Sequence, residues 1–313
     1  MVVSALLVCG VAAVFSLALT PLLRALATGI GLLDAPGHRK IHCRPTPRIG
    51  GVAVFLATTA ALAAAVPILD VGVATLPLLI GASMVFAVGL RDDIRETSAL
   101  PKVCVQVLAA FVLVANDIRI THVALPGGIQ ELGLFSFPIT IIWIVLVTNA
   151  FNLIDGLDGL AAGLAIIAGI TCAVDVAREG DVASSMMLAA VVGALSGFLV
   201  YNFNPASIFL GDGGSLFVGF MLASVAVVSW QRGGGTADPA GVSVLAFCVP
   251  MLDTVQCITR RLWCGGLRQV IRPDLAHIHH RLVAGGWSHR RAVLLLYVVS
   301  ASVAVVSVLR HLR

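Results

Sequence analysis

The sequence contains little charge. Asp, Glu, Lys and Arg make up 12% of its 313 residues, whereas 59% of the residues are hydrophobic. A soluble domain usually carries about 25% charged residues, so the composition excludes an ordinary water-soluble fold. It predicts a polytopic integral membrane protein whose main partner is the lipid bilayer, with no nucleic-acid partner. Aromatic residues are also few, at 6%, so Leu, Val and Ala supply the apolar surface.

Several common sequence signatures are missing as well. None of the seven cysteines forms a C-x-x-C pair, so we interpret them as small apolar side chains rather than a disulfide or metal framework. The chain also lacks a G-x-x-x-x-G-K-[ST] loop, a G-x-S-x-G elbow and a zinc signature. The first apolar run can span a bilayer and has no basic segment before it, so we expect no cleavable signal peptide.

Long apolar runs are what the sequence does contain. Ten of them predict ten transmembrane helices in a single domain, 1–313: residues 2–23, 50–67, 71–90, 103–116, 137–154, 158–175, 183–201, 214–230, 241–259 and 291–309. Residues 119–138 alternate polar and apolar side chains around Pro126 and two glycines, which predicts a small periplasmic β-hairpin. The expected fold is all-α apart from this hairpin.

The basic residues are unevenly distributed between the loops. Fifteen of the 20 Lys and Arg residues lie in the odd-numbered loops. The positive-inside rule therefore makes these loops cytoplasmic and both termini periplasmic. Five polar clusters also fall on the cytoplasmic side, at residues 34–51, 91–102, 149–159, 202–215 and 272–282. Their convergence on one membrane face predicts a functional site there.

Asp92 and Asp93 end the third predicted span. Adjacent carboxylates repel each other, and at an apolar boundary one pKa tends to rise, which suits a general base or a metal-facing pair. The alternative is a pair of solvated loop acids that Arg91 and Arg95 neutralise. A dipeptide alone does not decide between the two.

The segment "FLGDGGSLFVG" places Asp212 among glycines where the eighth span begins. Exposed N–H groups near a helix N-terminus favour anions, and the Asp can hold Mg²⁺ against those anions. Asp212 can also act as the N-cap of the helix, and both roles are compatible.

Two further segments are rich in cations. "HIHH" (277–280) lies beside Arg281 in a basic loop, where phosphate contact or proton transfer suits clustered His and Arg. The alternative is a basic surface loop attracted to anionic lipid. "HRKIHCRPTPRIGG" (38–51) is either part of the same site or a juxtamembrane basic patch.

Four polar residues follow one another at intervals of three in "NAFNLIDGLDGLAAG": Asn149, Asn152, Asp155 and Asp158. Asn in a span can bond to a neighbouring helix, but intramembrane acids are functional candidates by default. Three residues turn an α-helix by about 300°, so one straight helix cannot direct all four into one pocket. Because Gly156 and Gly159 make a break easy, we expect the fifth helix to end near Ile154 and the sixth to begin near Asp158.

The residues at this membrane face suit a Mg²⁺-bound phosphate ester, because they combine acids, carboxamides and glycines with His and Arg. The apolar walls suit a lipid co-substrate. At this point the motifs carry a resemblance. Together, "DAPGHRKIHCRPTPRIGG", "GLRDDI", "NAFNLIDGLDGLAAG", "FLGDGGSLFVG" and "HIHHRL" resemble the polyprenyl-phosphate N-acetylhexosamine-1-phosphate transferase family (glycosyltransferase family 4). The motifs keep the family's order over nearly the whole chain.

The resemblance implies an Mg²⁺-dependent reaction, with Mn²⁺ as a possible substitute. A polyprenyl phosphate such as undecaprenyl phosphate attacks the β-phosphate of a UDP-sugar, the sugar-1-phosphate moves to the lipid, and UMP leaves. It also implies a location in the bacterial inner membrane and leaves a homodimer open. This step is the first membrane step of a cell-envelope polysaccharide.

The resemblance also implies roles for individual residues. Asp92, Asp93 and His279 are the expected catalytic residues, and Asp212 with Asn152 are the expected metal ligands. The expected substrate-binding residues are Arg39, Lys40, Lys102, Asn149, Asp155, Asp158, Phe209, Gly211, His277, His280 and Arg281.

"HIHHRL" with the preceding "RPDLA" resembles the branch that uses UDP-N-acetylglucosamine, which starts O-antigen, common-antigen or teichoic-acid linkage synthesis. The alternatives are another UDP-N-acetylhexosamine or UDP-MurNAc-pentapeptide. An ion-coupled transporter is a more distant hypothesis, because its path needs polar residues on both faces. A catalytically inactive scaffold is disfavoured because the motif set is complete.

Overall fold

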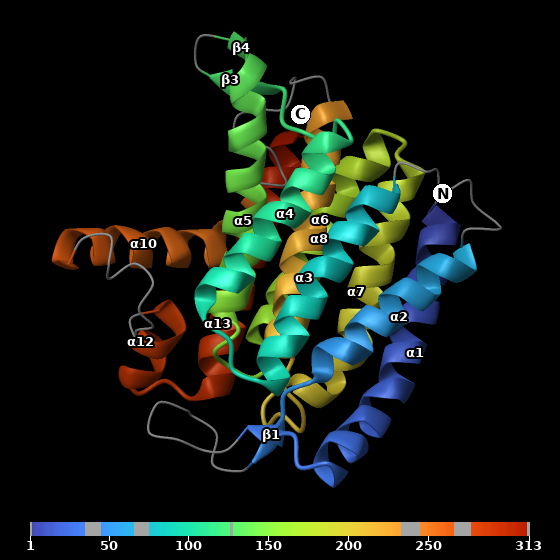
Figure 1. The fold of residues 1–313 in the computed structure, drawn as a ribbon, viewed down its shortest axis with the longest axis vertical. Helices are drawn as coiled ribbons and strands as arrows, with labels where there is room; N and C mark the ends of the chain where they lie inside the picture. Colours follow the sequence, from blue (N-terminus) through green and yellow to red (C-terminus); the bar gives the residue numbers. More distant parts are fainter. Residues whose placement is uncertain are drawn as a thin grey trace.

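The computed structural model describes residues 2–34, 45–65, 75–125, 128–232, 245–265 and 277–311. It is a bundle of long helices with two small strand pairs (Figure 1). The helices are α1 (Val2–Gly29), α2 (Gly50–Ala65), α3 (Leu76–Ile94), α4 (Ala99–Ala115), α5 (Ser136–Ile154), α6 (Leu160–Arg178), α7 (Val182–Asn202), α8 (Gly211–Arg232), α10 (Cys248–Gly265), α12 (Ile278–Ala284) and α13 (His289–His311), with a short 3₁₀ turn, η2 (Gly133–Phe135).

Each of the ten predicted spans overlaps a helix. Among the described residues, six helices are long and apolar enough to cross a membrane: α1, α5, α6, α7, α8 and α13. Two more, α2 and α4, are apolar but shorter, and α3 has Arg91, Asp92 and Asp93 in its last turn. Many large apolar side chains of α1 are exposed, Leu6 and Val14 among them, as expected where a helix faces lipid. The all-α polytopic fold is confirmed.

The ninth predicted span differs from the structure in its bounds and direction. The predicted run covers 241–259, but α10 begins at Cys248 and ends at Gly265, and it lies across the direction of the other helices (Figure 1). Arg260 lies on this helix, and Leu252 and Trp263 on it are 68% and 94% exposed. A helix that combines cations with exposed apolar side chains suits a membrane interface better than a full span. Residues 233–244 lie outside the described part of the chain.

The helix α8 forms the centre of the bundle. It packs against α2, α3, α5, α6 and α7, and nearly all of its side chains from Gly213 to Val227 are buried. The ring of Phe217 on α8 contacts Phe55 of α2 and Phe86 of α3, and the latter two rings stack with centroids 4.0 Å apart. The first turn of α8 therefore occupies a fixed position among its neighbours.

Glycines allow α2 and α3 to approach the start of α8 closely. A Cβ on Gly51 would lie 2.2 Å from the backbone nitrogen of Gly214, and a Cβ on Gly89 would lie 2.5 Å from the carbonyl oxygen of Asp212. Both neighbours are backbone atoms, which cannot move aside as a flexible side chain could. The three helices therefore meet through backbone contacts at this end of the bundle.

Replacing Gly51 by Ala is expected to destabilise the protein, because the new methyl group collides with the backbone of Gly214. Overpacking of this kind costs about 1–3 kcal/mol. Thermal unfolding in detergent should show a midpoint several degrees lower. Gly10→Ala in α1 is the matched control, because no atom lies within 4 Å of its Cβ position. Equal midpoints for the two variants would contradict the close packing.

The predicted hairpin is confirmed. Strands β3 (His122–Leu125) and β4 (Gly128–Glu131) pair antiparallel, and a second short pair joins β1 (Leu33–Asp34) to β2 (Thr46–Pro47). The hairpin and both ends of the chain lie at one end of the bundle, and β1 and α12 lie at the other (Figure 1). The first end corresponds to the predicted periplasmic side.

The predicted helix break after the fifth span is also confirmed. The helix α5 ends at Ile154, a short turn follows, and α6 begins at Leu160. Gly159 precedes α6 with φ 77°, a left-handed conformation that favours glycine. The two Asn of the period-three run therefore lie on α5, and the two Asp lie in the turn.

Candidate active site

The acidic motifs meet at the end of the bundle that carries β1 and α12. The last turn of α3, the first turns of α4 and α8, and the last turn of α5 contribute polar side chains to one cluster. Residues 45–49 lead into α2 beside this cluster. The chain folds this way locally because three backbone bonds join the approach to α2 to the segment before α8: Gly50 and Gly51 donate to the carbonyls of Phe209 and Leu210, and Phe209 donates to the carbonyl of Pro47.

Asp93 caps the helix α8 from a different helix. The backbone N–H groups of Asp212 and Gly213 donate to its two carboxylate oxygens, each at 2.8 Å. Arg48 Nε lies 3.3 Å from the same carboxylate, whose side chain is 1% exposed. A negative charge at a helix N-terminus is stabilised by the unpaired N–H groups and the helix dipole. Of the two roles predicted for Asp212, the N-cap role therefore belongs to Asp93, and the carboxylate of Asp212 faces the cluster.

Lys102 joins two of the acids. Its Nζ lies 2.7 Å from Oδ2 of Asp212 and 3.2 Å from Oδ2 of Asp92. The other oxygen of Asp92 accepts the N–H of Thr97 at 2.7 Å, which fixes the chain where α3 leads into α4. The arrangement shows that the carboxylates of Asp92 and Asp212 can hold one cation between them.

Arg48 is a second cation of the cluster. Besides Asp93, its guanidinium lies 3.7 Å from Asp34 and 3.9 Å from Asp212. Although burial opposes the charged form, these carboxylates raise the pKa of Arg48 above its ordinary value, so it stays charged. Gly211 is required beneath it: φ is 75°, and a Cβ would lie 2.2 Å from the carbonyl oxygen of Arg48.

The two Asn of α5 have different partners. The side chain of Asn152 donates to Ser215 Oγ at 3.0 Å, and Ser215 in turn donates to the carbonyl of Gly211 at 2.9 Å. Asn152 is thereby held against the first turn of α8, which contains Asp212. Asn149 lies one turn earlier on α5 and pairs with Gln106 of α4, so its contact links two helices.

The two Asp of the turn also differ. Burial and the neighbouring carboxylates of Asp212 and Asp93 raise the pKa of Asp155 well above its ordinary value. Asp155 therefore belongs electrostatically to the acidic cluster. Asp158 instead accepts the side chain of Asn204 at 2.8 Å and the N–H of Ala206 at 3.0 Å, so it holds the loop that leads from α7 to α8.

The histidine segment lies against the same turn. His279 is 1% exposed, and burial together with His280 lowers its pKa to about 3, so the ring is neutral. A Cβ on Gly156 would lie 2.1 Å from His279 Nε2, which places the ring directly on the turn. The rings of His279 and His280 lie 4.3 Å apart, and Arg281 is exposed.

The structure therefore brings seven of the sixteen predicted residues together. Asp92, Asp93, Lys102, Asn152, Asp155 and Asp212 form one cluster, and His279 contacts the turn beside it through Gly156. His277 instead faces Asp253, Phe209 contributes its backbone, and Asn149 pairs with Gln106. Arg39 and Lys40 lie outside the described residues.

Sequence reasoning missed four residues: Arg48, Gln106, Ser215 and Asp253. Arg48 was one of several cations in a basic loop, and nothing in the sequence singled it out. Ser215 lies at i+3 from Asp212 and so on the same face of α8. Asp253 carried the clearest signal, because it is an acid inside a predicted apolar span.

The composition of the cluster suits a divalent cation. It contains the four carboxylates of Asp92, Asp93, Asp155 and Asp212, and among the described residues two cations, Arg48 and Lys102, make ion pairs with members of it. The carboxylates therefore outnumber the cations. Carboxylate and amide oxygens are the ligands that Mg²⁺ prefers, and Lys102 already occupies a position between two of the acids. The residues present therefore fit such an ion.

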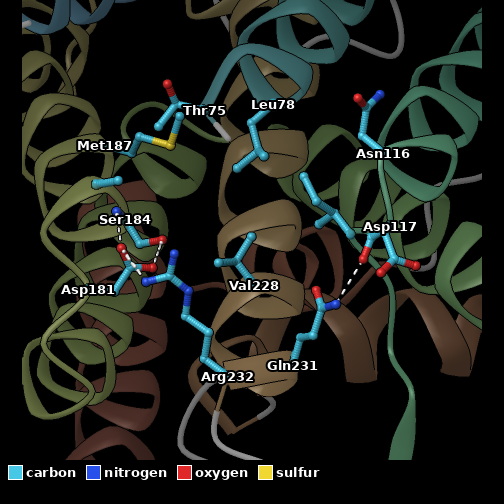
Figure 2. Close-up of a pocket in the computed structure, with 12 residues that line it drawn as sticks. Thr75, Leu78, Asn116, Asp117, Asp181, Ser184, Met187, Val228, Gln231 and Arg232 are labelled. Atoms are coloured by element: carbon cyan, nitrogen blue, oxygen red, sulfur yellow. Dashed lines mark hydrogen bonds and ion pairs between the residues drawn. The ribbon is translucent and has the colours of Figure 1, made fainter. Parts of the chain in front are cut away.

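The opposite end of the bundle has a different character. A pocket of about 390 Å³ lies there between the ends of α3, α4, α7 and α8. Figure 2 shows that two of its polar side chains have partners within the pocket: Arg232 pairs with Asp181 at 2.9 Å, and Gln231 donates to the backbone carbonyl of Asp117 at 2.8 Å. The carboxylate cluster around Lys102 lies at the other end, with α12.

Comparison with known proteins gives consistent results. Residues 75–230 match the sequence model of glycosyl transferase family 4. The chain is 36% identical over 285 residues to the "Probable undecaprenyl-phosphate N-acetylglucosaminyl 1-phosphate transferase" of Bacillus subtilis (strain 168), covering 90% of this chain and 78% of that protein. It is 37% identical over 314 residues to the decaprenyl-phosphate N-acetylglucosaminephosphotransferase of Mycobacterium leprae (strain TN), covering 91% and 78%. For the undecaprenyl-phosphate alpha-N-acetylglucosaminyl 1-phosphate transferase of Escherichia coli (strain K12), identity is 28% over 296 residues, covering 91% and 78%.

Proposed function

Since this chain belongs to glycosyl transferase family 4, we propose that it transfers N-acetylglucosamine-1-phosphate from UDP-N-acetylglucosamine to a polyprenyl phosphate, undecaprenyl phosphate in particular. The observation that carries the proposal is the joining of Asp92, Asp93 and Asp212 around Lys102 and Arg48 at one end of the bundle. Relatives across nearly the whole chain are named for this transfer to undecaprenyl or decaprenyl phosphate.

The reaction exchanges one phosphorus–oxygen bond for another. An oxygen of the lipid phosphate bonds to the β-phosphorus of the UDP-sugar, the bond from that phosphorus to the bridging oxygen breaks, and UMP leaves with the electron pair. Phosphoryl transfer of this type depends mainly on positioning and on neutralising the charge that develops on the oxygens. Lys102 and Arg48 are placed to supply positive charge, and the apolar helix surfaces suit the lipid chain.

The two adjacent acids suit different tasks. Both oxygens of Asp93 accept N–H groups of α8, so this carboxylate holds the site together. One carboxylate oxygen of Asp92 accepts the N–H of Thr97, and the other accepts from Lys102, which also bonds Asp212. Asp92 is therefore the better candidate for the base that receives a proton from the lipid phosphate.

Mg²⁺, with Mn²⁺ as a substitute, is the proposed metal. When bound, it would neutralise the pyrophosphate oxygens of the UDP-sugar. Asp212 and Asn152 are the ligands expected to hold it, and the contact of Asn152 with Ser215 orients this amide beside the first turn of α8. The positive charge of the ion would also offset the negative charges of the other carboxylates in the cluster.

The proposed setting is the bacterial inner membrane, with the site on the cytoplasmic face and both termini periplasmic. Fifteen of the 20 basic residues support this orientation. UDP-sugars are charged and water-soluble, so they require a site that opens at a membrane surface. The product is the first lipid-linked intermediate of a cell-envelope polysaccharide.

The proposal predicts UMP release that needs both substrates and a divalent cation. Purified protein in detergent should release UMP from UDP-N-acetylglucosamine only when undecaprenyl phosphate and Mg²⁺ are present, and EDTA should stop it until Mg²⁺ is restored. A parallel series with UDP-N-acetylgalactosamine and UDP-MurNAc-pentapeptide determines the sugar. Release independent of the lipid, or unaffected by EDTA, would contradict the proposed reaction or the proposed metal, respectively.

A further inference from the structure

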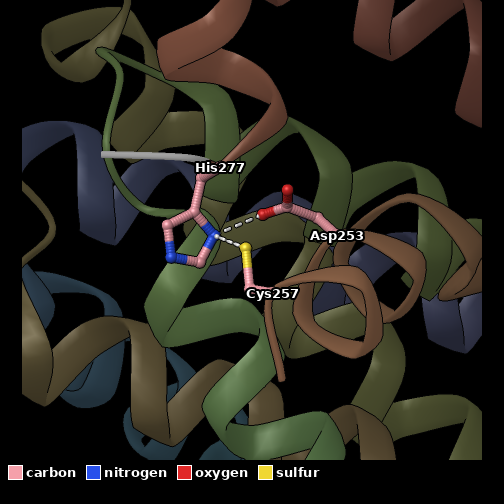
Figure 3. A group of neighbouring side chains, drawn as sticks. All are labelled: Asp253, Cys257 and His277. Carbon is pink, nitrogen blue, oxygen red and sulfur yellow. Dashed lines mark hydrogen bonds and ion pairs between the residues drawn. The ribbon is translucent and has the colours of Figure 1, made fainter. Parts of the chain in front are cut away.

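A buried group of three side chains lies between α10 and the start of α12, outside the acidic cluster. His277 Nδ1 lies 2.7 Å from Asp253 Oδ2 and 3.4 Å from Cys257 Sγ (Figure 3). Asp253 and Cys257 come from α10, and each of the three residues is less than 5% exposed. Neither the acidic cluster nor the proposed chemistry accounts for this group.

The geometry does not favour a metal site or a nucleophile. Ligand atoms around a tetrahedral zinc ion are about 3.3 Å apart or more, given metal–ligand distances of about 2.0–2.3 Å, so the 2.7 Å between Oδ2 and Nδ1 is a hydrogen bond. A nucleophile relay needs the acid and the thiol on different ring nitrogens. Here both face Nδ1, so the bond from His277 to Asp253 is the feature to explain.

Asp253 fixes both the ring of His277 and the start of α12. A carboxylate can only accept, so Nδ1 of His277 carries the proton and donates it to Oδ2. The other oxygen of Asp253 accepts the N–H of Ile278, the first residue of α12, at 2.7 Å. His277 precedes this helix and makes no side-chain cap of its own, so Asp253 supplies the cap.

The position of His277 determines that of His279. Their rings are stacked, with centroids 5.7 Å apart and planes 16° from parallel. His279 in turn lies against Gly156, in the turn that contains Asp155 and Asp158. Within the described part of the chain, neither nitrogen of the buried His279 ring has a hydrogen-bond partner. A buried polar ring without a partner, next to the acidic cluster, is suited to meet a bound ligand.

We propose that Asp253 is a positioning residue, which acts through His277 to hold α12 so that His279 meets the nucleotide part of the UDP-sugar at the 155–158 turn. This inference rests on the proposed function. It also changes the role predicted for His277, which orients the segment instead of touching the substrate. The contact with the turn is direct, because the ring lies against Gly156, the residue that follows Asp155.

Asp253→Asn tests the proposal with little change in size. The amide oxygen can still accept the N–H of Ile278, but the amide NH₂ now faces Nδ1 and moves the ring proton to Nε2. The KM for UDP-N-acetylglucosamine should rise on the order of 10-fold, because a small misplacement of a binding group has effects of this size or larger. The KM for undecaprenyl phosphate and the thermal midpoint should stay close to those of the wild type.

Three further variants separate positioning from a purely structural role. His277→Asn places an amide N–H near the position of Nδ1 and should recover part of what His277→Ala loses in KM. Cys257→Ala removes the Sγ contact to Nδ1 of His277 without altering the Asp–His bond, so its KM should stay within about 2-fold of the wild type.

The outcomes are distinguishable. Wild-type protein that releases no UMP would overturn the proposed function. Active wild type with an unchanged KM in Asp253→Asn would overturn the positioning role alone. A lower thermal midpoint accompanied by equal losses for both substrates would overturn it too, because that result indicates only a weakened fold.

Discussion

Asp212→Asn is expected to reduce UMP release by about 100- to 1,000-fold or more, the loss typical when a preorganised charge in a phosphoryl-transfer site is removed. The side chain lies between Lys102 at 2.7 Å and Arg48 at 3.9 Å. Asn keeps the shape of Asp but not its charge, so it holds a divalent cation poorly and leaves Lys102 with Asp92 alone. Initial rates of UMP release across a Mg²⁺ titration are the measurement.

The fold should tolerate this change. The backbone N–H of Asp212, not its side chain, is what Asp93 caps, so the start of α8 keeps its hydrogen bonds. Asp117→Asn is the matched control: this acid lies at the opposite end of the bundle and is 77% exposed, and Asn tolerates its φ of 62°. Near-normal turnover in Asp212→Asn, or an equal loss in Asp117→Asn, would exclude Asp212 from the metal site.

Much of the fold could be predicted because membrane helices are recognisable in a sequence by their length and apolar composition. The helix break at Gly156 and Gly159 was predictable for a different reason. Four polar residues at intervals of three cannot share one face of a straight helix, so the backbone had to turn. The same argument correctly placed the two Asn on the helix and the two Asp in the turn. It did not predict that Asn149 and Asn152 would have partners on different helices.

The direction of α10 and the partners within the site were not predictable in this way. An apolar run of the right length looks like a span whether it crosses the bilayer or lies along its surface, and tertiary packing decides. Likewise, the dipeptide Asp92-Asp93 contains no information about which carboxylate faces a distant helix end. The bonds from Asp93 to Asp212 and Gly213 join residues about 120 positions apart, and only the packing of Gly51 and Gly89 against α8 brings them together.

Asp93→Ala is expected to abolish activity and also to lower stability, unlike Asp212→Asn. Removing the carboxylate leaves the N–H groups of Asp212 and Gly213 without their acceptor, at a cost of about 1–3 kcal/mol for each buried donor. It also leaves Arg48 without its nearest carboxylate. The thermal midpoint in detergent should fall by several degrees, and UMP release should be lost.

The comparison of Asp93→Asn with Asp92→Asn tests the division of roles between the two acids. In Asp93→Asn the amide NH₂ faces a backbone N–H that needs an acceptor, so the start of α8 is disturbed and the midpoint falls. In Asp92→Asn the amide oxygen can still accept from Thr97, and Lys102 keeps Asp212. That variant should lose turnover with little loss of stability. If both variants unfold at the same temperature, Asp93 is not the cap on which the site depends, and the base could be either acid. If only Asp93→Asn is destabilised, Asp92 is the acid left to act on the lipid phosphate.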